Sequence, residues 1–331
     1  MAKNVLVSII IRAYNEERLI GKLLESIKKQ NFNSDQIEII VVDSGSEDST
    51  LQIISNYQVK LIKIKKEDFS FGYSLNKGIE IAKGKEIILI SAHCYPKSNN
   101  WISKMVEPFK DNSIGIVYGR QVGNETTEYS ENRIFSKLFP DRNEGIQEIP
   151  FCNNANCAIR KDLWSKQHYD ETLSGLEDLD WAIKIGKKGY KIYYAPSACV
   201  YHLHNETHSQ IKNRYKREAI AYKRINPDEN FNSIDYFKMF LLNVSTDLYF
   251  AKKEKKLLKN IASIFTFRHY QFIGTHQGFN VTNIDSDLKR IFYYPDKGGD
   301  GKRYVPIIEF FIRIKNNFRL LLNFCKYNKP E

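Results

Sequence analysis

Short runs of branched apolar residues alternate with segments of helical periodicity over the first 90 residues. Residues 5–11 read Val-Leu-Val-Ser-Ile-Ile-Ile, which is typical of a strand buried on both faces. Residues 16–30 then place apolar side chains three and four positions apart, as on one face of a helix. The alternation continues with strands expected at 37–42, 59–64 and 86–90, and helices at 50–57 and 74–83. This order predicts an α/β fold with a mostly parallel, Rossmann-like sheet flanked by helices, which binds ligands at the carboxyl ends of its strands.

The pattern changes twice further along the chain. Helices are expected at 100–109 and 178–188, and strands at 114–118, 151–160, 192–194 and 199–203. Residues 120–150 are polar and contain two prolines, so we expect a long irregular excursion there. A basic helix is expected at 209–225, followed by a helical, aromatic and lysine-rich segment. We therefore predict one domain over residues 1–225 and a helical, basic C-terminal extension over 226–331.

Composition narrows the class of protein without choosing a partner. The 331 residues are 42% hydrophobic, so the chain can bury a core, and global disorder is excluded. Lys and Arg exceed Asp and Glu by 11. A basic surface favours nucleic acid, anionic lipid or phosphorylated substrates.

The cysteines and the hydropathy pattern indicate the cellular compartment in which the protein is expected. The five cysteines are odd in number and widely spaced, which favours a reducing cytoplasm over a disulfide framework. No apolar run reaches the length of about 18 residues that a membrane span needs. The segment 304–327 has the pattern of a basic amphipathic helix, which can either lie at the inner face of a membrane or pack on the core.

Candidate chemistry gathers where the expected strands end. Asp43 ends a buried strand before Gly45, and it can either bind a nucleoside or hold a strand-end turn. No G-x-G-x-x-G follows the first strand, which argues against a nicotinamide or flavin enzyme. His93 follows another strand, and alternation places His202 and His204 on one face of a third. These histidines can form a metal site, or bind a diphosphate together with Arg214 and Arg217.

Three acids open the helix expected near residue 178. Glu177, Asp178 and Asp180 repel one another unless they meet a cation or have raised pKa values. One of the two aspartates can therefore serve as a general base. The alternative is a first turn of acids that complements the helix dipole.

In this order the segments resemble the family 2 glycosyltransferases, which have the GT-A fold. The likeness covers about residues 5–225, and its motifs are Ala13-Tyr-Asn-Glu16, Asp43-Ser-Gly-Ser-Glu-Asp-Ser-Thr50, Asn76 to Gly84, Phe151 to Arg160 and Glu177-Asp178. The bacterial rhamnosyltransferase-like branch is closer still. Its motifs resemble Phe69 to Asn76, Tyr118-Gly-Arg-Gln121 and His202-Leu-His204.

The resemblance implies a role for each of these positions. Asp178 is the implied catalytic base. The implied donor-binding residues are Arg12, Tyr14, Asn15, Glu16, Asp43, Ser91, His93 and Arg214. The implied acceptor-side residues are Glu177, Asn154 and Arg120, and the implied metal ligands are His93, His202 and His204.

The sequence departs from the family at its metal motif. D-x-D falls on Ser91-Ala92-His93, so the usual carboxylates are missing. A neutral imidazole can ligate a divalent ion but supplies no charge to hold Mg²⁺, which prefers oxygen. Two arrangements stay open, a divalent ion (Mn²⁺ or Mg²⁺) or a metal-independent site.

The resemblance implies an inverting transferase that moves a sugar from a nucleotide diphosphate sugar, such as dTDP-rhamnose or a UDP-sugar, to a bacterial surface glycan. The acceptor is expected on a capsule, O-antigen or cell-wall polysaccharide, either free or lipid-linked. Peripheral membrane contact and no nucleic-acid partner are expected. The alternatives are a metal-dependent hydrolase, a nucleic-acid-binding protein and a catalytically inactive relative that binds the acceptor.

Overall fold

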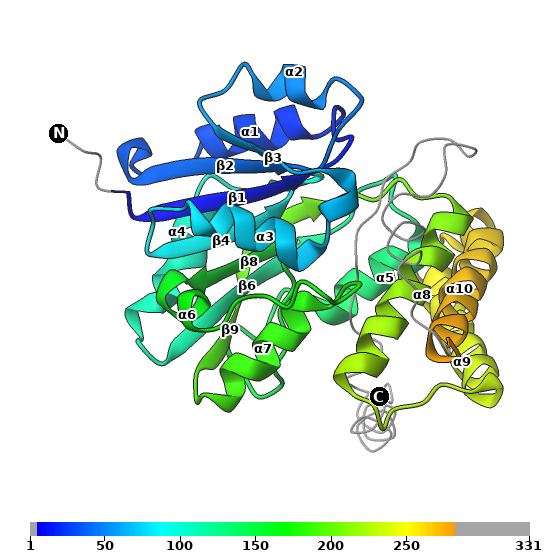
Figure 1. The fold of residues 1–331 in the computed structure, drawn as a ribbon. Coiled ribbons are helices and arrows are strands. Elements are labelled where there is room, and N and C mark those ends of the chain that lie inside the picture. The colour runs from blue at the N-terminus through cyan, green and yellow to red at the C-terminus, as the bar shows by residue number, and fades with distance from the viewer. Residues whose placement is uncertain (1–4, 282–331) are drawn as a thin grey trace.

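One nine-stranded sheet organises residues 5–281, the part of the chain that this computed structural model describes (Figure 1). The strand order is β3-β2-β1-β4-β8-β6-β9-β5, and β7 pairs with β9. The strands are β1 Val7–Ala13, β2 Ile37–Asp43, β3 Lys60–Lys63, β4 Glu86–Ser91, β5 Cys94–Pro96, β6 Ile114–Val122, β7 Gly145–Gln147, β8 Asn156–Arg160 and β9 Lys191–His202.

The first four strands in sequence form the predicted parallel sheet. Ala13 of β1 pairs with Asp43 of β2, and Arg12 pairs with Ser91 of β4. The polar ends of these strands therefore meet at one edge. Beyond β4 the sheet is mixed, because β8 runs antiparallel to both β4 and β6, whereas β6 and β9 are parallel.

Helices cover both faces of the sheet. They are α1 Ile20–Lys28, α2 Thr50–Ile54, α3 Phe71–Glu80, α4 Trp101–Val106, α5 Tyr129–Leu138, α6 Lys161–Lys166, α7 Glu177–Lys187, α8 His208–Ile225, α9 Ser233–Lys253 and α10 Leu257–Phe279. Strand alternation sends Ile9 and Ile11 into the core under α1 and α4, and Ile10 into the core under α3 and α7. Two packed layers of helix thus enclose a sheet that is apolar on both sides.

The expected irregular excursion over residues 120–150 is wrong in part. The strand β6 continues to Val122, and α5 and β7 follow within the segment. Two polar residues of α5 are buried in specific pairs, Ser130 with Asp247 and Glu131 with His204. Their polarity therefore reflects internal hydrogen bonding and not exposure to water. The two short strands expected at 192–194 and 199–203 are likewise one strand, β9, with a register shift against β6.

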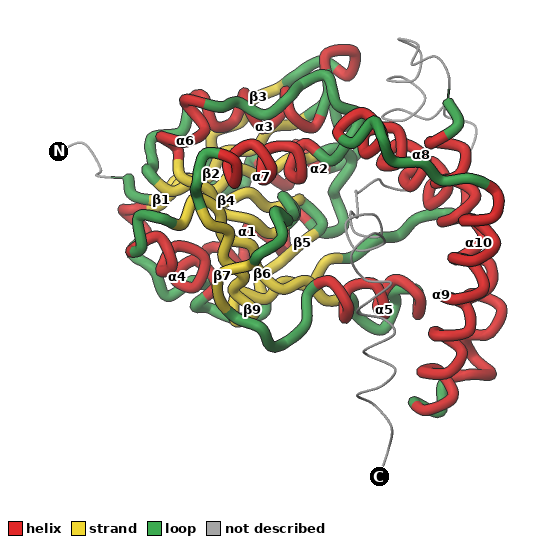
Figure 2. The backbone as a smooth tube through the Cα atoms, turned by 90° about the horizontal axis from the view of Figure 1, so that it is seen from below, coloured by secondary structure: helices red, strands yellow, loops and turns green. Residues whose placement is uncertain are grey.

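Helices α8, α9 and α10 form a layer beside the sheet, with α5 between them and the strands (Figures 1 and 2). Gly274 and Gly278 allow α10 to approach α8 closely, since a Cβ atom on either would lie 2.2 or 2.3 Å from a backbone oxygen of α8. Arg268 of α10 is buried and donates to Asp247 of α9 at 2.8 Å. A division at residue 225 stays a prediction, because α8 packs on α10 across it.

Among the helices within residues 5–281, none is both long enough and apolar enough to cross a bilayer. The amphipathic segment predicted at 304–327 lies outside the described residues.

Candidate active site

The turn after β2 is built on Asp43. This side chain is 1% exposed, and its Oδ1 atom accepts the backbone N–H groups of Gly45 and Ser46, both at 3.0 Å. The Ser46 hydroxyl donates to Oδ2. Gly45 has φ of +87°, in the left-handed region that favours glycine. The carboxylate thus holds the strand-end turn. Because two carboxylate oxygens have about four acceptor sites, it retains capacity for a ligand.

The loop after β1 is tied to this turn. The backbone N–H of Asn15 donates to the Ser46 hydroxyl at 2.9 Å, and Asn15 Oδ1 accepts the N–H of Glu47 at 2.8 Å. Beside it, the Lys66 ammonium group lies 5.1 Å from the centroid of the Tyr14 ring. The predicted donor residues Tyr14, Asn15 and Asp43 therefore belong to one connected loop pair.

The end of β4 places His93 beside a buried carboxylate. The backbone N–H of Ala92 donates to the carbonyl oxygen of Arg12 at 3.2 Å, which fixes the chain after Ser91. His93 Nδ1 lies 2.8 Å from Glu16 Oε1, and both side chains are buried. His93 Nε2 is buried and has no hydrogen-bond partner among residues 5–281.

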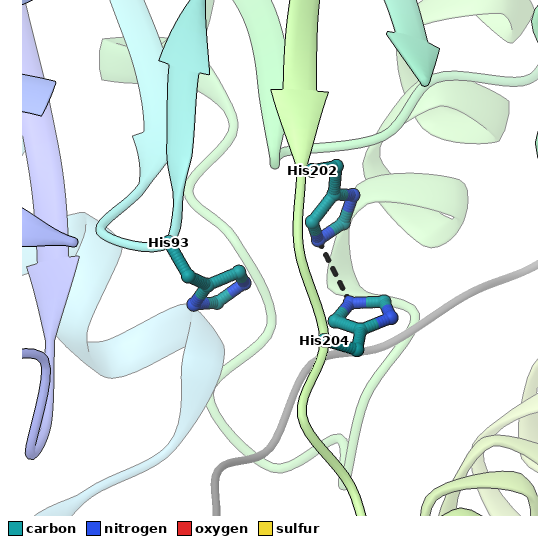
Figure 3. Close-up of side chains that lie close together, drawn as sticks. All are labelled: His93, His202 and His204. Carbon is teal, nitrogen blue, oxygen red and sulfur yellow. Dashed lines mark hydrogen bonds between the residues drawn. The ribbon is translucent and has the colours of Figure 1, made fainter. Parts of the chain in front are cut away.

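His202 and His204 lie on one side of the end of β9, as strand alternation predicts, and His93 lies opposite them (Figure 3). His202 Nδ1 is 2.6 Å from Gln121 Oε1, and His204 Nδ1 is 2.7 Å from Glu131 Oε1. The two Nε2 atoms are 2.9 Å apart. The ring of His93 stacks on that of His202 with centroids 5.2 Å apart. Each of the three imidazoles offers a nitrogen within 4.8 Å of the others.

Burial keeps the imidazoles of His202 and His204 neutral. It lowers the pKa of His202 well below its ordinary value, and it lowers the pKa of His204 to about 4 although Glu131 opposes the shift. Burial alone would raise the pKa of Glu131, but His204 and Arg214 lower it to about 2. The neutral rings of His202 and His204 therefore lie beside the ionised carboxylate of Glu131.

Arg214 of α8 reaches the same cluster. Its Nη2 atom donates to Glu131 Oε1 at 2.9 Å and to Glu206 Oε2 at 2.5 Å. Within the part of the chain that the structure describes, its buried Nε and Nη1 atoms have no hydrogen-bond partner. A guanidinium with spare donors suits a phosphate oxygen. Burial raises the pKa of Glu206 to about 7, against the opposing charge of Arg214.

Asp178 lies in the first turn of α7 and is 2% exposed. Its Oδ2 atom accepts the backbone N–H of Asn154 at 3.1 Å, and Oδ1 accepts that of Leu179 at 2.8 Å. Burial raises the pKa of Asp178 to about 8, and the neighbouring charge of Glu177 adds to the shift. A carboxyl with this pKa is suited to proton transfer near neutral pH.

Glu177 joins this carboxyl to β1. Glu177 Oε1 accepts from Arg12 Nη1 and from Asn154 Nδ2, both at 3.3 Å. The Arg12 guanidinium also lies 4.7 Å from the centroid of the Phe71 ring. The structure thus brings together Arg12, Asn154, Glu177 and Asp178, which the sequence placed in three separate motifs.

Arg120 is the predicted site residue that points elsewhere. Its Nη2 atom lies 3.9 Å from Asp141 Oδ2, and its side chain is 32% exposed. Gln121, its neighbour in the same motif, is buried and contacts His202. The sequence motifs did not identify Glu131 or Glu206. Glu131 lies in the segment that was expected to be irregular. Alternation along β6 was the signal that could have identified Gln121.

Comparisons with known proteins agree with this geometry. Residues 8–166 match the model of the family described as Glycosyl transferase family 2. The O-antigen chain rhamnosyltransferase RfbN of Salmonella typhimurium is 27% identical over 222 residues, which cover 63% of this chain and 70% of that protein. An uncharacterized glycosyltransferase of Haemophilus influenzae is 26% identical over 326 residues, 93% of this chain and 97% of that one.

A solved structure shares the fold. The mannosyltransferase PcManGT from Pyrobaculum calidifontis, in complex with GDP-Man and Mn²⁺, superposes with a TM-score of 0.58. It is 18% identical, and the match covers 82% of this chain and 86% of that chain. The predicted GT-A fold with a helical C-terminal extension is confirmed.

Proposed function

Because residues 8–166 match the model of the family 2 glycosyltransferases, we propose that this chain transfers a sugar from a nucleotide diphosphate sugar to a hydroxyl group of a bacterial surface glycan. Family 2 is inverting, so the product carries the opposite anomeric configuration. The likeness to an O-antigen chain rhamnosyltransferase supports dTDP-rhamnose as the donor, with a UDP-sugar as the alternative. The observation that carries the proposal is the buried Asp178 beside Glu177 and Arg12.

Asp178 is the proposed base. Its carboxylate removes the proton from the acceptor hydroxyl, whose oxygen attacks the anomeric carbon as the bond to the diphosphate oxygen breaks. The N–H groups of Asn154 and Leu179 orient the carboxylate. One displacement at carbon inverts the configuration, which needs no covalent intermediate on the protein.

The acceptor side of the site is proposed around Glu177 and Asn154. Both lie beside Asp178, and Arg12 compensates the charge of Glu177. Arg120 was predicted for the same role, and its position next to Asp141 supports at most a contact with a distant part of the acceptor.

The donor is proposed to lie across the ends of β1, β2 and β4. The nucleoside packs near Tyr14 and bonds to Asp43, whose turn is completed by Ser46 and tied to Asn15. The diphosphate then lies toward Ser91, His93 and Arg214. The spare buried donors of Arg214 support this orientation.

The residues present fit a divalent ion. The buried His93 Nε2 has no hydrogen-bond partner within residues 5–281, and the nitrogens of His202 and His204 lie close to it. These three residues would hold the ion. When bound, such an ion stabilises the negative charge that develops on the leaving diphosphate. The alternative is direct contact between the diphosphate and the imidazole and guanidinium groups.

We further propose that the enzyme works on the cytoplasmic face of a membrane with anionic lipids. Helices α9 and α10 carry outward apolar side chains at helical spacing, with Phe237 61%, Leu241 60% and Leu258 93% exposed. Exposed lysines surround the turn between these helices, namely Lys252, Lys253, Lys255, Lys256 and Lys259. An apolar face beside clustered lysines is complementary to anionic headgroups.

The apolar face of α9 and α10 is less complementary in charge to another basic segment of the chain than to an anionic membrane. The chain beyond residue 281 includes the basic segment 304–327, which would be repelled by the same lysines. Both basic regions can instead contact one anionic surface. The acceptor glycan is accordingly proposed to be lipid-linked.

A nucleotide-release assay tests the proposed function. The purified full chain is incubated with dTDP-rhamnose, UDP-sugars or GDP-sugars, with and without lipid-linked surface glycan. We expect nucleoside diphosphate release that depends on the acceptor, and a glycan of increased mass. Equal release without acceptor would support the metal-dependent hydrolase. Donor binding without any transfer would support an inactive relative.

A further inference from the structure

Three imidazole rings meet at the ends of β4 and β9 (Figure 3). Each ring is held through its Nδ1 atom. The acceptors are Glu16 Oε1 for His93, Gln121 Oε1 for His202 and Glu131 Oε1 for His204, at 2.8, 2.6 and 2.7 Å. Carboxylate and amide oxygens only accept hydrogen bonds, so each Nδ1 atom carries the ring proton. The three rings therefore share one tautomer.

The orientation of the Gln121 amide group is fixed by its neighbours. Gln121 Nε2 donates to Asn153 Oδ1 at 3.0 Å, and the same Asn153 atom accepts the backbone N–H of Ala155 at 3.1 Å. A backbone N–H can only donate, so that Asn153 atom is an oxygen and the Gln121 atom facing it is a nitrogen. Gln121 consequently presents its oxygen to His202.

With Nδ1 protonated, the Nε2 atoms present lone pairs to one another. Those of His202 and His204 are 2.9 Å apart, and that of His93 is buried without a hydrogen-bond partner in the described chain. Two lone pairs at this distance repel unless a cation lies beside them. A second proton on either ring would add a buried positive charge close to Arg214, which shares Glu131 with His204. A metal ion coordinated by the nitrogens removes the conflict.

We propose that His93, His202 and His204 form a three-imidazole site for one transition-metal ion, with a preference for Zn²⁺ and Co²⁺ over Mn²⁺ and essentially no affinity for Mg²⁺. Imidazole suits these ions, whereas Mg²⁺ requires oxygen ligands. Three protein ligands leave a coordination position for a ligand oxygen, as in catalytic sites. The site itself is independent of the proposed function, and only its role at the donor diphosphate rests on it.

Glu16, Gln121 and Glu131 are positioning residues in this arrangement. They fix the tautomer and the orientation of each ring, and the two carboxylates make their rings better electron donors. Where the family has D-x-D, this chain has Ser91-Ala92-His93. An imidazole nitrogen would therefore bind the metal ion in place of carboxylate oxygens.

Titration with Co²⁺ tests the site on the full chain after chelation and dialysis. We expect one equivalent to bind with the visible absorption bands of a nitrogen-ligated, low-coordinate ion. Zn²⁺ should displace it stoichiometrically, and millimolar Mg²⁺ should not. Absence of these bands, or equal competition by Mg²⁺, overturns the proposal.

Matched variants assign the ligands. His93→Gln should abolish the bands. Glu16→Gln and Glu131→Gln keep an acceptor oxygen but lose the charge, so each should weaken Co²⁺ binding by about 10–100-fold while the chain still folds, as circular dichroism would show. His168→Gln is the control, because this exposed ring stacks on Trp164. Binding by the first three variants as tight as that of the parent contradicts the assignment.

The outcomes separate the site from the proposed function. Stoichiometric Co²⁺ binding without any sugar transfer supports the site and removes the transferase. Full transfer by metal-free protein that also fails to bind Co²⁺ supports the transferase and removes the site.

Discussion

The backbone N–H of Asn154 donates to Asp178 Oδ2 at 3.1 Å, so the loop before β8 orients a carboxylate at the start of α7. These residues are 24 positions apart in the chain, and both are almost completely buried. The contact fixes one face of the carboxylate and leaves its remaining acceptor sites for a substrate hydroxyl. Asp178 is therefore oriented before the acceptor binds.

Asp178→Asn should reduce turnover by about 10²–10⁴-fold, because the amide cannot accept the proton of the acceptor hydroxyl. The affinity for the nucleotide-sugar donor should stay close to that of the parent in a thermal-shift titration. Asp180→Asn is the matched control, since Asp180 lies on the same helix and pairs with Lys184 at 2.6 Å. An Asp178→Asn enzyme with parental turnover would remove Asp178 from the role of base.

The pH dependence of rate and stability should have opposite signs. The transfer rate should rise with pH and level off above about pH 8, where Asp178 becomes ionised. The pKa of Asp178 is higher in the folded state than in the unfolded state, so the fold favours the protonated carboxyl. Its contribution to the free energy of unfolding is therefore complete at low pH. That contribution is lost as pH rises from about 4 to 8.

Chemical denaturation at several pH values checks the stability effect. The free energy of unfolding of the parent should fall more steeply between pH 4 and 8 than that of Asp178→Asn. Identical slopes for the two proteins would show that Asp178 does not titrate in this window.

Asp43→Asn should weaken nucleotide binding by about tenfold or more, since it removes a charge-assisted hydrogen bond worth about 1.5–3 kcal/mol. The amide oxygen can still accept the N–H groups of Gly45 and Ser46, so the turn should persist. Calorimetric titration with nucleoside diphosphates measures the effect. Asp48→Asn is the control in the same loop, because Asp48 Oδ1 accepts the N–H of Thr50. Equal affinities for the two variants would restrict Asp43 to holding the turn.

Replacing Phe237, Leu241 and Leu258 together by serine should abolish co-sedimentation with vesicles that contain phosphatidylserine or phosphatidylglycerol. These side chains are exposed in the described chain, so folding should be retained. The control replaces Leu61 and Ile146, which are 40% and 50% exposed elsewhere on the surface.

Deletion of residues 304–331 should weaken the same binding. Parental binding by both the serine variant and the deletion would exclude a membrane role for these regions. A concentration-dependent dimer in the absence of vesicles would assign the apolar face to a second copy of the chain.

Gly274→Ala should destabilise the protein by about 1–3 kcal/mol, because its Cβ atom would lie 2.2 Å from the carbonyl oxygen of Lys212. Gly186→Ala is the control. Its Cβ atom would meet only Pro150 at 3.9 Å, and alanine in a helix should stabilise the protein by about 0.5–1 kcal/mol. Urea denaturation of the full chain compares the two. A neutral Gly274→Ala would mean that α10 is free to move away from α8.

Sequence patterns located the strand ends because that information is local. A run of branched apolar residues predicts a buried strand, and the next polar residue lies at the sheet edge, as Asp43 and His93 do. Alternation similarly placed His202 and His204 on one face. In each case the position of the side chain follows from the pattern within a single strand.

The partners of the histidines could not be predicted in this way. Glu131 and His204 are 73 positions apart, and Glu131 lies on a helix whose buried polar residues resembled a loop. The motif that contains Arg120 and Gln121 was identified, but it does not state which of two neighbouring side chains faces the cluster. The structure places Gln121 there and directs Arg120 to Asp141.

Arg214 stands on α8, and Gly274 and Gly278 of α10 pack against the backbone of the same helix at Lys212 and Lys216. A fragment that stopped at residue 225 would retain the Arg214 guanidinium but would lose α10, which packs against the helix that carries it. It would also uncover Ala219, which is buried and lies beside Gly278 of α10. An autonomous catalytic module should accordingly end after α10, and not at the boundary at residue 225 that the sequence pattern predicts.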